Sequence, residues 1–108
     1  MRVEYDGLAY SIYEADSVTV INDSTLVIDD VMLQDPSHHD YHMGPIPPHV
    51  HQKQIFHFDG EGALRYAVKI GDNQQEGILD GYITNGGFAE TLHIDAKGNV
   101  DPTGMRGP

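Results

Sequence analysis

The stretch that decides the fold is ALRYAVKIGDNQQEGILDGYIT, residues 63–84. Residues 63–70 and 78–84 have the composition and spacing of two short β-strands. The glycine, aspartate and asparagine at 71–73 favour a turn between them. This part of the chain therefore predicts a strand, a turn and a second strand.

The same pattern continues outward in both directions. Further short strands are predicted at residues 8–12, 18–21, 26–33, 54–58 and 90–95. The dipeptide Asn85-Gly86 is a hairpin signal, because both residues tolerate the positive φ of a type I′ turn. A helix at 87–94 is the alternative to the last strand. About seven to eight short strands separated by turn residues predict an all-β jelly roll, sandwich or small barrel.

Two segments interrupt this rhythm. Residues 35–48 are predicted to form a long loop, and residues 101–108, DPTGMRGP, an exposed C-terminal arm that offers almost nothing to bury. At 108 residues the chain has the length of one domain. We therefore expect a single jelly-roll β domain over residues 1–100, followed by the arm.

The chain is strongly acidic, with 17 Asp and Glu against 6 Lys and Arg and a net charge of −11. The basic residues are scattered, so no patch exists to neutralise phosphates, and binding to nucleic acid or to an anionic membrane is disfavoured. The absence of cysteine excludes disulfides, thiolate metal sites and cysteine nucleophiles. No apolar run is long enough to span a bilayer. We expect a soluble protein of the cytoplasm or of a virion.

Histidines are concentrated in one part of the sequence, since six of the seven fall between residues 38 and 57. His49 and His51 are two residues apart, and side chains at that spacing lie on one face of a strand. Because imidazole is the commonest metal ligand in proteins, the pair predicts a divalent metal site, with His57 as a candidate third ligand. The alternative is that these imidazoles are solvated on a loop and an edge strand.

The segment around this pair, GPIPPHVHQKQIFHFDGEG at residues 44–62, resembles the first signature of the cupin superfamily. His49 and His51 match the two histidines of the signature. Gln54 stands where the signature has a glutamate, and Gly60 follows it by six residues as the signature requires. The resemblance implies a cupin-like β-sandwich that holds iron, manganese, nickel or zinc.

A second cupin signature would supply a third histidine, and His93 lies at a comparable distance after a glycine-rich turn, although the proline of that signature is missing. Gln54 cannot neutralise a divalent ion as a carboxylate would. Metal affinity is therefore expected to fall unless Asp40, Asp59 or Glu61 supplies the missing charge. The activities that the resemblance implies range from dioxygenases and isomerases to non-enzymatic binders of sugars or small ligands.

The cluster SHHDYH, residues 37–42, contains His38, His39 and His42. We interpret it as a solvated polar loop. The alternative is an interface site, because a histidine near a threefold axis occurs three times and can share an ion. The edge strands of so small a sandwich need cover, so a homodimer or homotrimer is expected in either case.

Two functions are consistent with these observations. The first is a small cupin-like metal- or ligand-binding protein of reduced or no catalytic activity. The second is a non-enzymatic cement, decoration or spike-type subunit of a phage or virus particle, which contacts itself and neighbouring capsid-type subunits. The acidic charge, the arm at 101–108 and the loop at 35–48 favour the second function. The jelly roll occurs in both classes, and whether the protein is an enzyme stays open.

Overall fold

A computed structural model of the chain describes residues 16–84 and 87–101. These residues contain eight strands: β1 (Asp16–Asn22), β2 (Asp30–Gln34), β3 (Asp40–Met43), β4 (His51–Phe56), β5 (Gly62–Ile70), β6 (Asn73–Ile83), β7 (Ala89–Ile94) and β8 (Val100–Asp101). Within this part of the chain, no helix has the length and apolar character needed to cross a membrane. The all-β class predicted from the sequence is confirmed.

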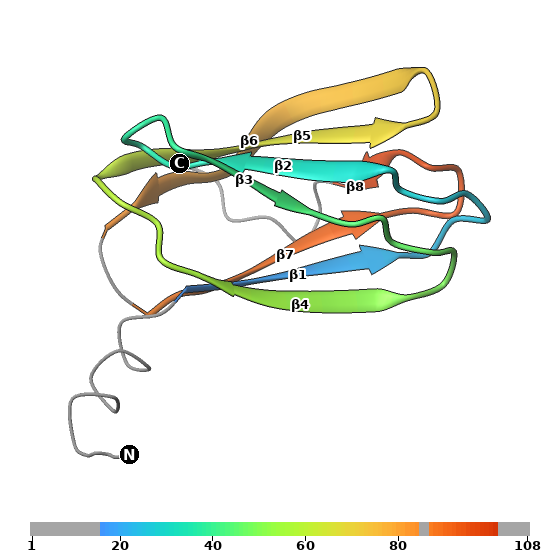
Figure 1. The fold of residues 1–108 in the computed structure, drawn as a ribbon, viewed down its shortest axis with the longest axis horizontal. Helices are drawn as coiled ribbons and strands as arrows, with labels where there is room; N and C mark the ends of the chain where they lie inside the picture. Colours follow the sequence, from blue (N-terminus) through green and yellow to red (C-terminus); the bar gives the residue numbers. More distant parts are fainter. Residues whose placement is uncertain (1–15, 85–86, 102–108) are drawn as a thin grey trace, which may run out of the picture.

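The strands form two four-stranded sheets that pack against each other as a β-sandwich (Figure 1). Sheet I has the order β4-β1-β7-β8, and sheet II has the order β3-β2-β5-β6. The neighbours β1 and β7 run parallel, whereas the other neighbouring strands of both sheets are antiparallel.

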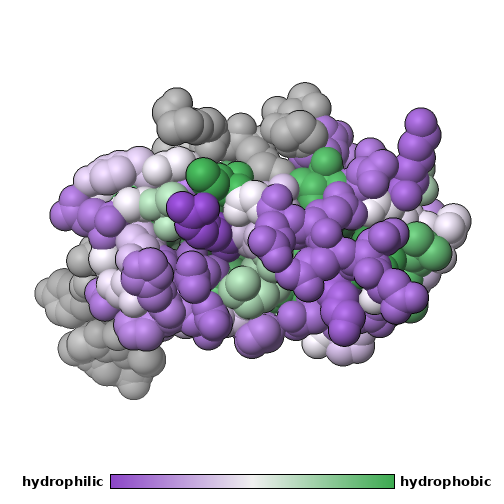
Figure 2. Space-filling view, turned by 90° about the horizontal axis from the view of Figure 1, so that it is seen from above, coloured by the Kyte–Doolittle hydropathy of each residue, from purple (hydrophilic) through white to green (hydrophobic). Residues whose placement is uncertain are grey.

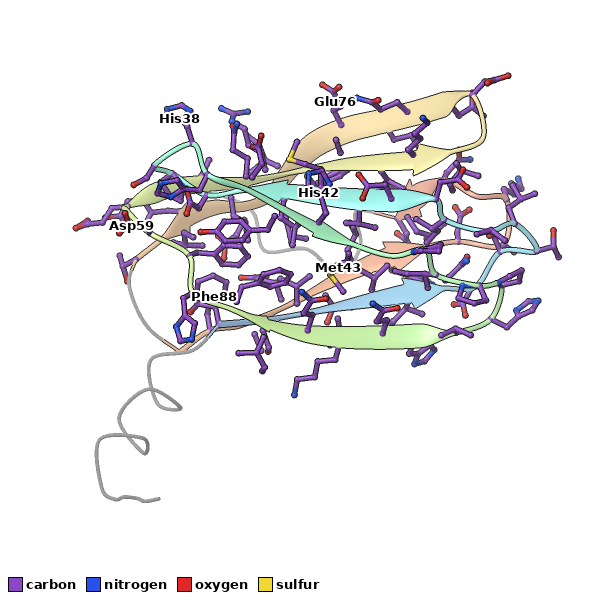
Figure 3. The ribbon with its side chains drawn as sticks, viewed as in Figure 1. His38, His42, Met43, Asp59, Glu76 and Phe88 are labelled. Carbon is purple, nitrogen blue, oxygen red and sulfur yellow. The ribbon has the colours of Figure 1, made fainter. Side chains whose placement is uncertain are left out.

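Alternation of side chains along each strand builds the core. In β1, Val18 and Val20 are fully buried, whereas Thr19 and Ile21 face outward. Sixteen buried apolar side chains of the described residues form one cluster between the sheets. Met43 of sheet II is one of them and projects into this space (Figure 3). Each fully buried aliphatic side chain contributes about 1.5–3 kcal/mol relative to an exposed one, so the interior is a packed core.

The predicted strand–turn–strand at 63–84 is present, but its second strand begins earlier than predicted. Only Gly71 and Asp72 form the turn, because Ile70 and Asn73 already pair across it. Residues 73–77, NQQEG, lack the apolar alternation of a strand. They still pair with β5, because β6 is an edge strand whose first half is largely solvated.

The predicted loop at 35–48 is wrong in part, because it contains the strand β3. This edge strand pairs with β2 and buries one side chain, Met43. Ile46, also in the predicted loop, forms a β-bridge with Ile28. A strand of four residues carries too little periodicity to be seen in the sequence.

Other boundaries shift by a few residues. The segment at 87–94 contains strand β7 and no helix. Asp101 was predicted to lie in the exposed arm, but it belongs to β8 and pairs with His93 of β7. The predicted strand at 8–12, the Asn85-Gly86 turn and the rest of the arm lie outside the described residues. The strands on either side of that turn, β6 and β7, belong to different sheets.

Candidate functional site

The histidine pair proposed as metal ligands does not share a strand. His49 lies in a turn with a left-handed φ of 61°, and β4 begins only at His51. His51 pairs with Ile21, which faces outward from sheet I, so its side chain is directed away from the core. Both histidines are exposed. The expectation that they project together from one strand is therefore wrong, because the chain turns at His49 before it becomes extended.

His93 lies on the same face as His51 but on the other side of β1. Both residues are in register with Ile21, one on each neighbouring strand. Two strand spacings separate them, about 10 Å, whereas two imidazoles on one zinc ion each lie about 2 Å from the metal. The structure therefore does not bring His51 and His93 together.

The remaining candidate ligands are also dispersed. His57 is exposed just beyond β4, and its backbone carbonyl accepts a hydrogen bond from the Tyr41 hydroxyl at 3.2 Å. Gln54 is exposed as well, and it lies on the opposite face of β4 from His51 because the two are three residues apart. The strand geometry therefore directs Gln54 away from the side of β4 that carries His51.

The three candidate substitute carboxylates have separate surroundings. Asp40 accepts a hydrogen bond from Gln34 at 3.1 Å, and Glu61 accepts one from the Tyr82 hydroxyl at 2.5 Å. Asp59 is exposed in the segment between β4 and β5. Within residues 16–84 and 87–101, no group of three or more His, Cys, Asp or Glu side chains is arranged to hold a metal ion.

The histidines of the 37–42 cluster contact different carboxylates. The Nδ1 atom of His39 lies 3.2 Å from Asp35, and that of His42 lies 3.0 Å from Asp30. His38 has a left-handed φ of 70° and is exposed (Figure 3). The three side chains are therefore available at the surface, as a solvated segment would leave them.

A buried carboxylate that the sequence analysis did not single out organises this end of the molecule. The Asp35 side chain is fully buried, and it accepts hydrogen bonds from the backbone N–H groups of Ser37, His39 and Asp59 and from the Tyr41 hydroxyl. Burial alone would raise the pKa of this carboxyl group, but the hydrogen bonds outweigh it and the pKa is lowered. Burial and the bond to Asp35 raise the pKa of Tyr41 to about 12. The signal in the sequence was the Asp-Pro-Ser turn pattern.

A second cluster joins three strands of sheet I. The Nε2 atom of His93 lies 2.6 Å from Asp23, just after β1, and its Nδ1 atom lies 3.3 Å from Asp101 in β8. The hydrogen bond with Asp23, helped by the charge of both carboxylates, raises the pKa of His93. An imidazole with a carboxylate at each nitrogen is best satisfied when both nitrogens carry a proton.

The outer face of sheet II contains a groove of about 310 Å³. Ala67 of β5 lies at its centre, in register with Met32 of β2 on one side and Glu76 of β6 on the other. Gln34, Arg65 and Gln74 also line it. Figure 2 looks onto this face and shows a mainly hydrophilic surface with a small apolar area near its middle. No sequence pattern indicated the groove, because the wall from β2 is far in the chain from the parts that β5 and β6 contribute.

The outer face of sheet I is different, and we call the outward positions of β1, β4 and β7 the sheet I face. β1 and β7 contribute Ser17, Thr19, Ile21, Ala89, Thr91 and His93, and β4 contributes His51, Lys53 and Ile55. None of these nine positions is acidic. The sheet I face is thus a surface of short side chains with one permanent charge.

Comparison with known proteins finds no matching family model, no matching curated protein and no matching solved structure. The interpretation therefore rests on the contacts described above. Two surfaces of the described residues are candidate binding sites: the sheet I face and the groove on sheet II.

Proposed function

We propose that the protein is a non-enzymatic structural subunit that assembles with copies of itself through the sheet I face. The observation that carries this proposal is the absence of acidic residues from the nine outward positions of β1, β4 and β7. The whole chain has 17 Asp and Glu and a net charge of −11. A surface that lacks acids in such a chain is the natural place for self-contact.

Electrostatics favours this orientation over others. Two copies of an acidic protein repel each other, and contacts between acidic surfaces must also desolvate carboxylates. The sheet I face lowers both costs, because Thr19 and Thr91 lie near its centre and the carboxylates at its margin, Asp23 and Asp101, contact the imidazole of His93. Sheet faces of this kind pack about 10 Å apart.

The open edge of sheet I supports the same proposal. Among the described strands, β4 pairs with β1 alone, so the N–H and C=O groups of its other edge have no strand partner. Ile55 on this strand is 55% exposed, and Val50 just before it is 37% exposed. A second copy that covers β4 would bury both apolar side chains and protect the edge.

The test is the oligomeric state of the full chain, measured by size-exclusion chromatography with light scattering. We expect a dimer or trimer for the native protein and a monomer for Thr91→Glu, which places a carboxylate in the middle of the face. Gln74→Glu is the matched control, since it adds the same charge to an exposed position on sheet II and should leave assembly intact. A native monomer at high concentration, or equal effects of both variants, would refute the proposal.

The setting that we propose for such a subunit is a phage or virus particle, as a cement, decoration or spike-type component. Lateral assembly of a small acidic sandwich through one face without acidic residues is compatible with a repeated shell. Localisation of the protein in purified particles, by mass spectrometry, would support this setting. A protein found throughout the cytoplasm and never in particles would contradict it.

Binding of iron, manganese, nickel or zinc stays a prediction. One observation favours a metal ion that is shared between copies of the protein. The rings of His49, His51 and His57 are exposed and form no hydrogen bond or ion pair with described residues. Elemental analysis of untagged protein should then find metal, and the double substitution His49→Ala, His51→Ala should remove it. Metal-free native oligomer would argue against this role.

A further inference from the structure

The groove on sheet II has an ordered floor. Ala67 has a short outward side chain on β5, and its cross-strand neighbours Met32 and Glu76 rise on either side. The adjacent outward row carries Gln34 and Arg65 in register. The volume of about 310 Å³ lies at the lower end of the range of about 300–1,000 Å³ typical of ligand pockets. The Glu76 side chain points away from the core (Figure 3).

Two amide–carboxylate pairs flank the floor and fix its polar groups. Gln34 donates to Asp40 at 3.1 Å on the β3 side, and Gln74 donates to Glu76 at 2.5 Å on β6. Each amide carbonyl and the remaining carboxylate oxygens are left as acceptors. Side chains that are already held in place lose less conformational freedom when a ligand binds.

Arg65 supplies the complementary donors. Its guanidinium makes no hydrogen bond or ion pair within the described residues, although the chain has an excess of acids. The lining of the groove therefore presents a free set of planar donors, the Arg65 guanidinium, beside fixed acceptors. This mixture is selective for ligands that both donate and accept hydrogen bonds.

Other ligand classes fit the lining poorly. An anion such as phosphate would meet a single cation, Arg65, in a chain with a net charge of −11. A divalent cation would meet one carboxylate, Glu76, whose Oε2 atom is already hydrogen-bonded. An apolar ligand would find Met32, Ala67 and Tyr66, but it would also cover the polar groups of Gln34, Arg65, Gln74 and Glu76, and burying polar or charged groups without partners is costly.

We propose that this groove binds a neutral saccharide. Its hydroxyl groups would accept from Arg65 and donate to the oxygens of Gln34 and Glu76, and the C–H face of a sugar ring would lie on Ala67 and Met32. The site is independent of the proposed assembly, because it lies on the opposite side of the sandwich from the sheet I face. Saccharide binding and self-assembly can therefore succeed or fail separately.

The experiment is a titration of the isotope-labelled full chain, followed by amide chemical shifts in solution. The probes are maltohexaose, cellohexaose, chitohexaose and xylohexaose, with spermidine and inorganic phosphate as probes of the charged alternatives. We expect at least one oligosaccharide to shift the amides around Ala67, Arg65 and Glu76. The same shifts should appear in Thr91→Glu, whether or not that variant is monomeric.

Two matched variants test the location. Ala67→Leu fills the floor and should weaken binding at least about tenfold, which corresponds to about 1.4 kcal/mol. Ala89→Leu makes the same change at an exposed strand position of the sheet I face and should leave affinity unchanged. The proposal is overturned if no saccharide shifts the groove amides, if both variants weaken binding equally, or if only spermidine or phosphate binds.

Discussion

The two outer faces of the sandwich are built by the same strand alternation but carry different chemistry. Sheet II exposes long charged side chains, among them Arg65, Lys69 and Glu76. The sheet I face exposes short hydroxyl and aliphatic side chains, with Lys53 as its one permanent charge. Its partly buried histidine, His93, is held by carboxylates at its margin.

The difference shows that the strand pattern and the charge pattern determine separate properties of the two faces. Period-two alternation decides which residues leave the core, and it does so equally in both sheets. Charge then decides which face stays in water, because long ionised side chains cost more desolvation and conformational entropy to bury than threonine or alanine. The sheet I face is therefore suited to close contact, and sheet II to water and small polar ligands.

The largest effect should come from a change in the buried part of the molecule, because both outer faces depend on the fold. Asp35→Ala would remove the buried acceptor of three backbone N–H groups, those of Ser37, His39 and Asp59, so we expect the free energy of unfolding to fall by about 3 kcal/mol. Urea denaturation measures it. Both faces should lose function together. Asp59→Ala removes an exposed carboxylate nearby and should change stability by less than about 0.5 kcal/mol; equal losses would show that Asp35 is not the organising group.

The second effect should be confined to one face. Thr19→Glu places a carboxylate at the centre of the sheet I face, and we expect self-association to weaken at least about tenfold, or about 1.4 kcal/mol. Thr19→Val keeps the size and the strand preference and should associate as the native protein does. Analytical ultracentrifugation gives both constants. If valine disrupts assembly as strongly as glutamate, shape or the hydroxyl group is decisive and charge is not.

The sequence predicted the parts of the fold that have two different faces. The strands that include Val18, Leu64 and Leu92 each bury one side and expose the other, and their periodicity was visible. The strand β3 and the first half of β6 were missed. The strand β3 does alternate, with Tyr41 and Met43 turned inward, but four residues are too few for the pattern to stand out. The first half of β6 is a solvated edge segment whose side chains need no alternation, so pairing with β5 alone makes it a strand.

The candidate sites were harder to predict, because they depend on geometry that local patterns do not contain. The spacing of His49 and His51 is correct for one face of a strand, but the left-handed φ at His49 breaks the strand. The groove needs Met32, Ala67 and Glu76 in register, and that register is set by pairing between distant segments. The low charge of the sheet I face also became visible only once β1, β4 and β7 were side by side.

The third prediction concerns pH at the margin of the sheet I face. The groups that face His93 are Asp23 after β1, Asp101 in β8 and, across Ile21, the imidazole of His51. Its pKa is raised in the folded state, so its stabilisation is fully present below a pH of about 6.5 and is lost as the pH rises through the raised pKa. Because the side chain is 32% exposed, we expect no more than about 0.5–1 kcal/mol.

Denaturation of the native protein and of His93→Gln at pH 6 and pH 9 measures this contribution. The stability difference between the two proteins should be largest at pH 6 and close to zero at pH 9. His42→Gln makes the same substitution in an exposed His–Asp pair on sheet II and serves as the control for the substitution itself. A difference that grows with pH would mean that neutral His93 is the stabilising form.

The smallest effect should come from the lysine at the open edge of the sheet I face. Lys53 lies in the middle of β4, and a charged side chain on an edge strand hinders pairing with another edge. Lys53→Thr should therefore strengthen self-association, by about 0.2–1 kcal/mol, which is up to about fivefold. The substitution also makes the chain more acidic, and this alone would weaken association. Lys69→Thr makes the same change in net charge on sheet II, so it separates the effect of net charge from the effect of position. If the protein self-associates through the sheet I face, sedimentation should show tighter assembly for Lys53→Thr and weaker or unchanged assembly for Lys69→Thr. Equal shifts would mean that net charge governs association and the face does not.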